Sequence, residues 1–233
     1  MAEVFINGPA GRIEARLHKS ENPRAPLALI LHPDPTLGGT LNNKVTYALF
    51  QAFVNMGFSV LRFNFRGVGR SQGQIDGTGV GELADSIAAL DYLQGLDLET
   101  NVCWIAGYSF GAWVAAQLLM RRPEIKGFVF VSPPTNLHPF DFLTPCPSSG
   151  LIIQGGQDTV VTEQSVAMLA EQLSGHRYVH VEYRLIPDAD HFYTNKLKDL
   201  HDTVVQMVPD IKSRKPKKTF KKIKRQPIPN DDY

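Results

Sequence analysis

Short apolar runs alternate with longer amphipathic segments along most of the chain. Continuous apolar runs bounded by Gly, Pro or Asp are typical of strands buried on both faces of a sheet. Such runs predict strands at 27–33, 58–65, 102–108, 127–133, 150–156 and 180–186. Apolar residues at helical spacing predict helices at 42–57, 82–95, 111–122, 163–173 and 191–208.

The segment before these strands has a different pattern. Residues 4–6 and 12–18 flank the turn 7–11 and predict an antiparallel hairpin. A hairpin followed by alternating strands and helices predicts an α/β fold with a mainly parallel sheet of about eight strands and helices on both faces. The connection 133–149 contains five prolines and is too short for a helical cap domain. We therefore expect a minimal or absent lid.

Composition narrows the class of protein. The 233 residues, 43% of them hydrophobic, suffice for one large α/β domain, or at most two small ones, with a substantial core. Cys103 lies in an apolar run and is expected to be buried, whereas Cys146 lies in the Pro-rich connection and is expected to be free and exposed. Two such cysteines form no disulfide framework, and the N-terminus lacks a signal-peptide pattern. These features predict a cytoplasmic protein without a transmembrane segment.

The net charge of +1 conceals an asymmetry between the body and the C-terminus. Residues 210–233 hold nine Lys or Arg and three Asp, which gives +6 and leaves −5 on residues 1–209. The segment 210–233 has few core-forming residues and several prolines, so we predict a disordered basic tail behind a domain at 1–209.

The stretch "GYSFG" at 107–111 matches the pattern G-x-S-x-G and joins a predicted strand to a predicted helix. In that context the pattern indicates a nucleophile elbow, in which a strained turn presents the Ser109 hydroxyl at a helix N-terminus. The alternative is a Gly-rich connection with an incidental serine. The rest of the chain decides between them, because a serine hydroxyl needs a base, and the base needs an orienting acid.

Both partners follow later strands in the required order. Asp158 comes just after the strand at 150–156, and His191 comes after the strand at 180–186. Asp158 has an alternative role as the cap of the helix that starts near Thr162. Asp188 and Asp190 compete with it as the acid, and "DADH" also allows a metal cluster, although no second His or Cys cluster has suitable spacing.

An oxyanion hole requires two N–H donors near the nucleophile. Phe110, which follows Ser109, supplies one of them. The other comes from the loop "HPDPTLGG", where Pro33 and Pro35 have no N–H, so Asp34 is the first candidate and Thr36 the second. A carboxylate facing the hole would oppose the oxyanion, and we therefore expect the Asp34 side chain to point away or to pair with a cation.

With these residues in place, the chain resembles the α/β-hydrolase superfamily, and within it the small bacterial hydrolases related to dienelactone hydrolases and serine-peptidase-like esterases. The resemblance covers about residues 3–209 and rests on "LHPDPTLGGTLNNKV", "RFNFRGVGRSQG", "GYSFG", "GGQD" and "DADHFY". It implies a three-layer α/β-hydrolase fold, a Ser109–Asp158–His191 triad and an acyl-enzyme, but no particular substrate. That group usually reads His-Pro-His-Pro in the first motif, so Asp34 departs from it.

The resemblance also implies roles for residues outside the triad. Loop 65–73 would be structural, with Arg66 and Ser71 bracing the turn and Asp85 as a partner. The other histidines are interpreted as structural or surface residues; they include His32, His138 and His176.

Two functions of different classes follow. The first is a serine hydrolase for small-molecule esters or thioesters, with peptide or amide bonds as a variant, needing no metal or cofactor. Its pocket wall is placed at 136–143, with Phe140 and Phe142 as apolar surfaces. The second is a non-catalytic binding protein whose basic tail contacts nucleic acid or anionic membrane. Oligomeric state and acyl specificity are not determined by the sequence.

Overall fold

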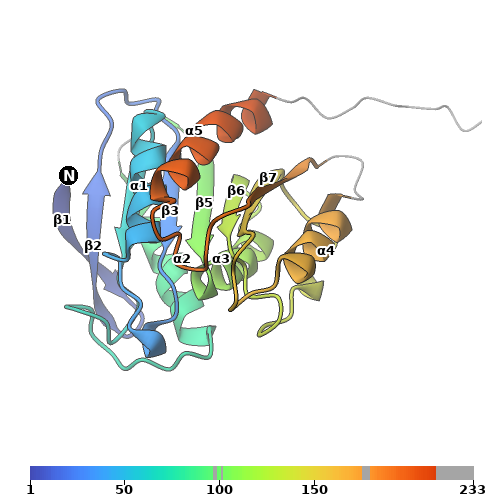
Figure 1. Cartoon of the computed structure of the whole chain (residues 1–233). Coiled ribbons are helices and arrows are strands. Elements are labelled where there is room, and N and C mark those ends of the chain that lie inside the picture. Colours follow the sequence, from blue (N-terminus) through green and yellow to red (C-terminus); the bar gives the residue numbers. More distant parts are fainter. Residues whose placement is uncertain (97–98, 101, 175–178, 214–233) are drawn as a thin grey trace, which may run out of the picture.

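The computed structural model describes residues 1–96, 99–100, 102–174 and 179–213 (Figure 1). An eight-stranded sheet has the order β1-β2-β4-β3-β5-β6-β7-β8. β1 (Ala2–Gly8) and β2 (Gly11–His18) form the predicted antiparallel hairpin, and β2 also pairs antiparallel with β4. The parallel part consists of β3 (Leu27–Leu31), β4 (Ser59–Phe63), β5 (Cys103–Tyr108), β6 (Ile125–Val131), β7 (Gly150–Gly155) and β8 (Val181–Ile186).

Helices cover both faces of this sheet, as the sequence predicts. They are α1 (Lys44–Asn55), α2 (Val80–Gln94), α3 (Phe110–Arg121), α4 (Glu163–Ser174) and α5 (Leu197–Ser213), with short 3-10 helices at Pro35–Leu37 (η1) and Asp141–Leu143 (η2). Asn43 caps α1 by accepting hydrogen bonds from the N–H groups of Val45 (2.9 Å) and Thr46 (3.3 Å).

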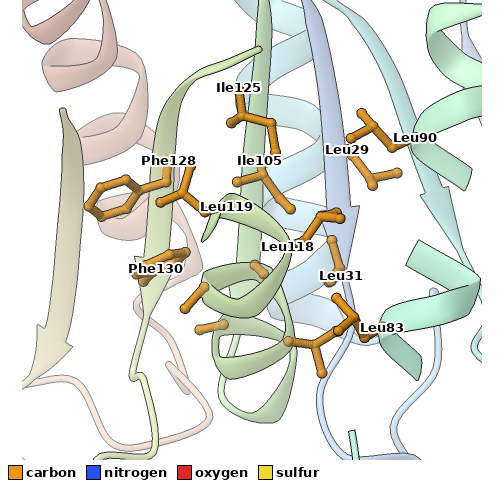
Figure 2. Close-up of a cluster of buried hydrophobic side chains, with 14 of the residues drawn as sticks. Leu29, Leu31, Leu83, Leu90, Ile105, Leu118, Leu119, Ile125, Phe128 and Phe130 are labelled. Atoms are coloured by element: carbon orange, nitrogen blue, oxygen red, sulfur yellow. The ribbon is translucent and has the colours of Figure 1, made fainter. Parts of the chain in front are cut away.

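Strand alternation divides the core into two layers. In β5, Cys103 and Ile105 face the layer formed with α2, α3 and α4, whereas Trp104 and Ala106 face the layer formed with α1 and α5. Figure 2 shows the first layer, in which Leu118 and other α3 side chains lie over the apolar side chains of the central strands. Both faces of the central strands are buried, which explains why their sequences are continuous apolar runs.

The last helix differs from its prediction at both ends. It begins at Leu197 rather than near residue 191, because Tyr193 (φ 53°) and Asn195 (φ 56°) adopt left-handed backbone that interrupts helical geometry. It continues through Pro209 to Ser213, since Val208 and Ile211 are buried against the sheet and compensate for the missing N–H. The boundary predicted after residue 209 therefore falls inside α5, and the tail from 214 to 233 lies outside the described residues.

The connection between β6 and β7 confirms the prediction of a minimal lid. Its only regular element among the described residues is η2, a single turn. The prediction that Cys146 is exposed is wrong. Its side chain packs into the same core layer as Phe140 and Leu143, with 5% of its surface accessible, because the connection folds back onto the sheet.

No described helix combines the length and the apolarity needed to cross a bilayer. The feature that positions the site is the carboxyl edge of the parallel strands. The segments after β3, β5, β7 and β8 carry Asp34, Ser109, Asp158 and His191 and meet at this edge, where open α/β sheets bind ligands.

Candidate active site

Ser109 occupies a sharp turn between β5 and α3. Its backbone is strained (φ 51°, ψ −124°), and its N–H donates to the carbonyl of Val131 on β6 at 2.9 Å. A Cβ on Gly107 would overlap the backbone of Gly111, and a Cβ on Gly111 would overlap the carbonyl oxygen of His32. Both glycines of G-x-S-x-G are therefore needed for the strand, the helix and the neighbouring loop to approach one another.

The turn places Ser109 at the N-terminus of α3. Ser109 is the N-cap residue, and its carbonyl accepts the N–H of Ala112 at 2.8 Å. Phe110 is the first helical residue, and a helix offers no internal acceptor to the N–H at that position. Its backbone N–H and the helix dipole are thus available for negative charge that develops beside Ser109.

Asp158 and His191 form a buried hydrogen-bonded pair. His191 Nδ1 lies 2.8 Å from Asp158 Oδ2, and the Asp158 side chain has no exposed surface. Burial raises the pKa of Asp158, but the hydrogen bonds from His191 and from the N–H groups of Val161 and Val160 outweigh it and hold the pKa below its usual value. At neutral pH the ionised carboxylate fixes the imidazole with its proton on Nδ1.

Asp158 does not cap α4, the alternative role considered above, but it does fix the loop that leads into this helix. Its Oδ1 accepts the N–H groups of Val160 (2.9 Å) and Val161 (2.8 Å), which precede α4, while Gln154 Nε2 donates to Oδ2 at 3.1 Å. The carboxylate therefore fixes the β7–α4 loop and His191 at the same time. The two roles are compatible because the two oxygens are used separately.

The competing acids do not contact the histidine ring. Asp188 is exposed and pairs with Lys196 at 3.5 Å, and Asp190 Oδ1 accepts the N–H of Thr194 at 2.8 Å. Nδ1 of His191 is occupied by Asp158. Among the described residues, no group of His, Cys, Asp and Glu has an arrangement that would hold a metal ion.

The loop carrying His191 is tied to the strand that carries Ser109. Tyr108, the last residue of β5, donates its hydroxyl hydrogen to the carbonyl of His191 at 2.8 Å, and the two rings lie 5.4 Å apart. This contact is not predictable from the sequence, because a Tyr in an apolar run is indistinguishable there from any core aromatic.

Asp34 lies across the site, at the start of η1. Its Oδ1 accepts both the N–H (2.8 Å) and the hydroxyl (2.7 Å) of Thr36, so the carboxylate caps η1. The N–H of Thr36, the second candidate donor, is thereby occupied. The N–H of Asp34 itself has no hydrogen-bond partner among the described residues, as an oxyanion donor requires.

The side chain of His32 hydrogen-bonds the backbone of the loop that carries Asp34 and joins it to the segment after β4. It is fully buried, its Nδ1 donates to the carbonyl of Pro33 at 2.6 Å, and its Nε2 accepts the N–H of Phe65 at 3.1 Å. Burial lowers its pKa to about 4, and the bond to Pro33 only partly opposes this. The ring is neutral at physiological pH, which supports its interpretation as a structural histidine.

A cavity of about 300 Å³ joins these residues. Ser109, Phe110, His191 and Asp34 line it, and Asp158 lies behind His191. Both Ser109 and His191 border the same space, although no hydrogen bond links their side chains; such bonds commonly tighten only when substrate binds.

Phe140 and Phe142, the predicted pocket wall, are not among the residues that line this cavity. Phe140 is buried in the core and borders a separate hollow beside α4, and Phe142 packs against that core. The segment does supply a wall, but through Leu137 and His138, whose N–H groups both donate to the carbonyl of Pro134 in a tight turn. The sequence shows the apolar residues of this turn but not the direction in which each one points.

The predicted bracing of loop 65–73 is present. Arg66 binds Asp85 through Nη2–Oδ1 (2.8 Å) and Nε–Oδ2 (3.1 Å). Ser71 donates its hydroxyl to the carbonyl of Asn64 (2.8 Å) and accepts the N–H of Glu14 (2.9 Å), so it ties the loop to β2 instead of to Asp85.

Comparison with known proteins agrees with this geometry. Residues 35–150 match the family model described as alpha/beta hydrolase fold. The uncharacterized protein RP471 of Rickettsia prowazekii is 46% identical over 208 residues, which is 88% of this chain and 87% of that protein.

Two solved structures are similar over nearly their whole length. ATU1826 of Agrobacterium tumefaciens, a proposed alpha/beta hydrolase of unknown function, has 49% identity and a TM-score of 0.86 over 89% of this chain and 95% of that one. XC6422 of Xanthomonas campestris, described as an α/β serine hydrolase without a lid, has 30% identity and a TM-score of 0.78 over 90% and 94%. The chain belongs to the alpha/beta hydrolase family.

Proposed function

We propose that the protein is a serine hydrolase that cleaves carboxylic esters or thioesters through an acyl-enzyme. The observation that carries the proposal is the 2.8 Å pair of Asp158 and His191, which borders the same cavity as the strained Ser109. Similarity to hydrolases supports the general class of reaction, and the arrangement of these side chains supports the serine mechanism.

In this mechanism His191 accepts the hydroxyl proton as Ser109 Oγ attacks the carbonyl carbon of the substrate. Asp158 keeps the imidazole in the required tautomer and stabilises the imidazolium that forms. The N–H groups of Phe110 and Asp34 bind the oxyanion of the tetrahedral intermediate. His191 then protonates the leaving oxygen or sulfur, and water, activated by the same imidazole, hydrolyses the acyl-enzyme.

The cavity mouth favours an apolar substrate. Four large apolar side chains that line it are well exposed: Leu37 (85%), Leu137 (65%), Phe192 (64%) and Val160 (42%). An apolar acyl or alcohol group that covers these side chains would stabilise the enzyme–substrate complex by about 25 cal/mol per Å² of apolar surface buried. Because the lid is minimal, these four side chains are the surface that a substrate reaches outside the cavity. The preferred substrate is therefore an ester whose hydrophobic group is long enough to extend from the cavity onto them.

A fluorophosphonate probe and p-nitrophenyl esters of increasing acyl length test the proposal. We expect labelling of the wild type at Ser109, hydrolysis that improves from acetate to longer chains, and loss of both in Ser109→Ala. Ser165→Ala is the matched control, because Ser165 borders the separate hollow beside α4. Equal inertness of wild type and Ser109→Ala toward both probe and esters would rule the proposal out.

A further inference from the structure

The charge of the cavity is unbalanced. Among the described residues that line it, Asp34 has the only carboxylate, and none is Lys or Arg. The titratable groups on the wall besides Asp34 are His138, His191 and Tyr108. His191 is engaged with Asp158 behind it, and burial raises the pKa of Tyr108 far above neutrality, so its hydroxyl stays uncharged.

His138 does not neutralise Asp34. Its ring stacks on Trp113 at 4.1 Å and contacts the ring of Phe110 edge-on at 5.8 Å. Burial among these rings lowers the pKa of His138, and the negative charge of Asp34 offsets that only in part. At neutral pH the imidazole is therefore uncharged.

The Asp34 carboxylate is held in place with one oxygen unused. Oδ1 accepts two hydrogen bonds from Thr36, and Pro33 and Pro35 restrict the backbone on either side. Oδ2 has no hydrogen-bond or ion-pair partner among the described residues. A fixed, half-buried anion with a free acceptor therefore lies beside the reacting groups.

We infer that Asp34 selects substrates by charge: the site accepts neutral and cationic esters and rejects esters that carry a carboxylate or phosphate near the reacting carbonyl. The inference rests on the proposed function and adds a specificity-determining role to the Asp34 side chain. A substrate ammonium within reach of Oδ2 gains a favourable interaction, whereas a substrate anion meets an uncompensated like charge in a site of reduced dielectric.

The test uses two ester series, each built on one parent ester. In the acyl series, p-nitrophenyl butyrate is neutral, p-nitrophenyl hemisuccinate is anionic and p-nitrophenyl γ-trimethylammonio-butyrate is cationic. In the alcohol series, phenyl acetate is compared with its para-carboxy and meta-trimethylammonio derivatives. The quantity compared is the ratio of kcat/KM for the cationic and anionic members, so changes in overall rate cancel.

The variant Asp34→Asn removes the charge and keeps an acceptor for Thr36. If this variant does not fold, Asp34→Ser is used in its place, because serine is also a good capping residue. We expect either variant to lower the cation-to-anion ratio at least about tenfold in one or both series, as expected for unit charges within about 8 Å at an effective dielectric constant near 20. Asp188→Asn removes the same charge from a side chain that is 79% exposed and outside the cavity, and it should leave the ratio within about twofold.

Salt gives a second readout that a merely structural role would not move. In the wild type, molar NaCl should reduce the ratio toward that of Asp34→Asn. Unchanged ratios in both series, with neutral esters still cleaved in a Ser109-dependent way, would overturn this inference alone. Absence of any Ser109-dependent hydrolysis would overturn the proposed function as well.

Discussion

Acid should destabilise the protein through His32, beginning near pH 6.5, above the ordinary pKa range of carboxylates. Both ring nitrogens are engaged in the fully buried site: Nδ1–H donates to Pro33, and Nε2 accepts from Phe65. Protonation would place a second N–H against the N–H of Phe65 and would bury a positive charge away from water. The folded protein therefore binds this proton only with difficulty.

The magnitude follows from the pKa of His32, which burial lowers from 6.5 to about 4. Each tenfold change in proton affinity corresponds to about 1.4 kcal/mol, so protonating the folded state costs about 3 kcal/mol more than protonating the unfolded chain. Because the folded pKa is depressed, the stabilisation is complete above about pH 6.5 and is lost as the pH falls toward 4. Between about pH 7.5 and pH 5 the loss amounts to about 2 kcal/mol.

Urea unfolding of wild type and His32→Gln at these two pH values measures this contribution. The variant lacks the titrating group, so we expect lower stability at pH 7.5 but a pH-dependence that is smaller by about 2 kcal/mol. Other groups, such as Glu82 with its raised pKa, titrate in both proteins and cancel in the comparison. An equal pH-dependence in the two proteins, or an NMR titration of His32 near its ordinary pKa, would refute this account.

Four further outcomes are expected. Gly111→Ala should destabilise the fold by roughly 2–3 kcal/mol in thermal unfolding, since its Cβ meets backbone rather than a movable side chain, and no change in Tm would contradict this. Asp158→Asn should lower kcat on the order of 10³-fold with little change in KM, and a small effect on kcat would exclude it as the orienting acid. Tyr108→Phe should cost about 1–3 kcal/mol in urea unfolding by leaving the buried carbonyl of His191 without its donor, and unchanged stability would contradict this. Removing residues 214–233 should leave esterase activity intact and abolish any salt-dependent binding to DNA or anionic vesicles, and full retention of such binding would disprove a role for this tail.

Much of the fold was predictable because the local sequence patterns favour the same elements that the tertiary structure contains. The apolar runs in the central strands, Asn43 before α1 and the glycines around Ser109 each indicate the element that the structure contains. Helix α5 was misplaced because the left-handed backbone of Tyr193 and Asn195, both non-glycine residues, has no reliable sequence signal.

The part of the candidate site that was predictable consists of residues that come directly after the carboxyl ends of strands. Ser109, Asp158 and His191 are single residues at fixed places in the topology, and the structure brings them together at one edge of the sheet. The wall was not predictable in the same way. The turn at 134–138 determines that Leu137 and His138 face the cavity while Phe140 enters the core, and this depends on tertiary contacts that no local pattern encodes.

The segment between β6 and β7 supplies Pro134, Leu137 and His138 to the cavity but none of the groups proposed for bond cleavage. Part of the substrate-facing surface thus lies on a stretch of chain that carries no proposed reacting group. This stretch is joined to the rest by packing and by hydrogen bonds such as that from Asn136 Nδ2 to the carbonyl of Val160. A gene that exchanges or lengthens this segment can acquire a different substrate range without rebuilding the reaction centre. Such modularity makes 132–149 the natural place for directed evolution, and for divergence among relatives that share the same scaffold.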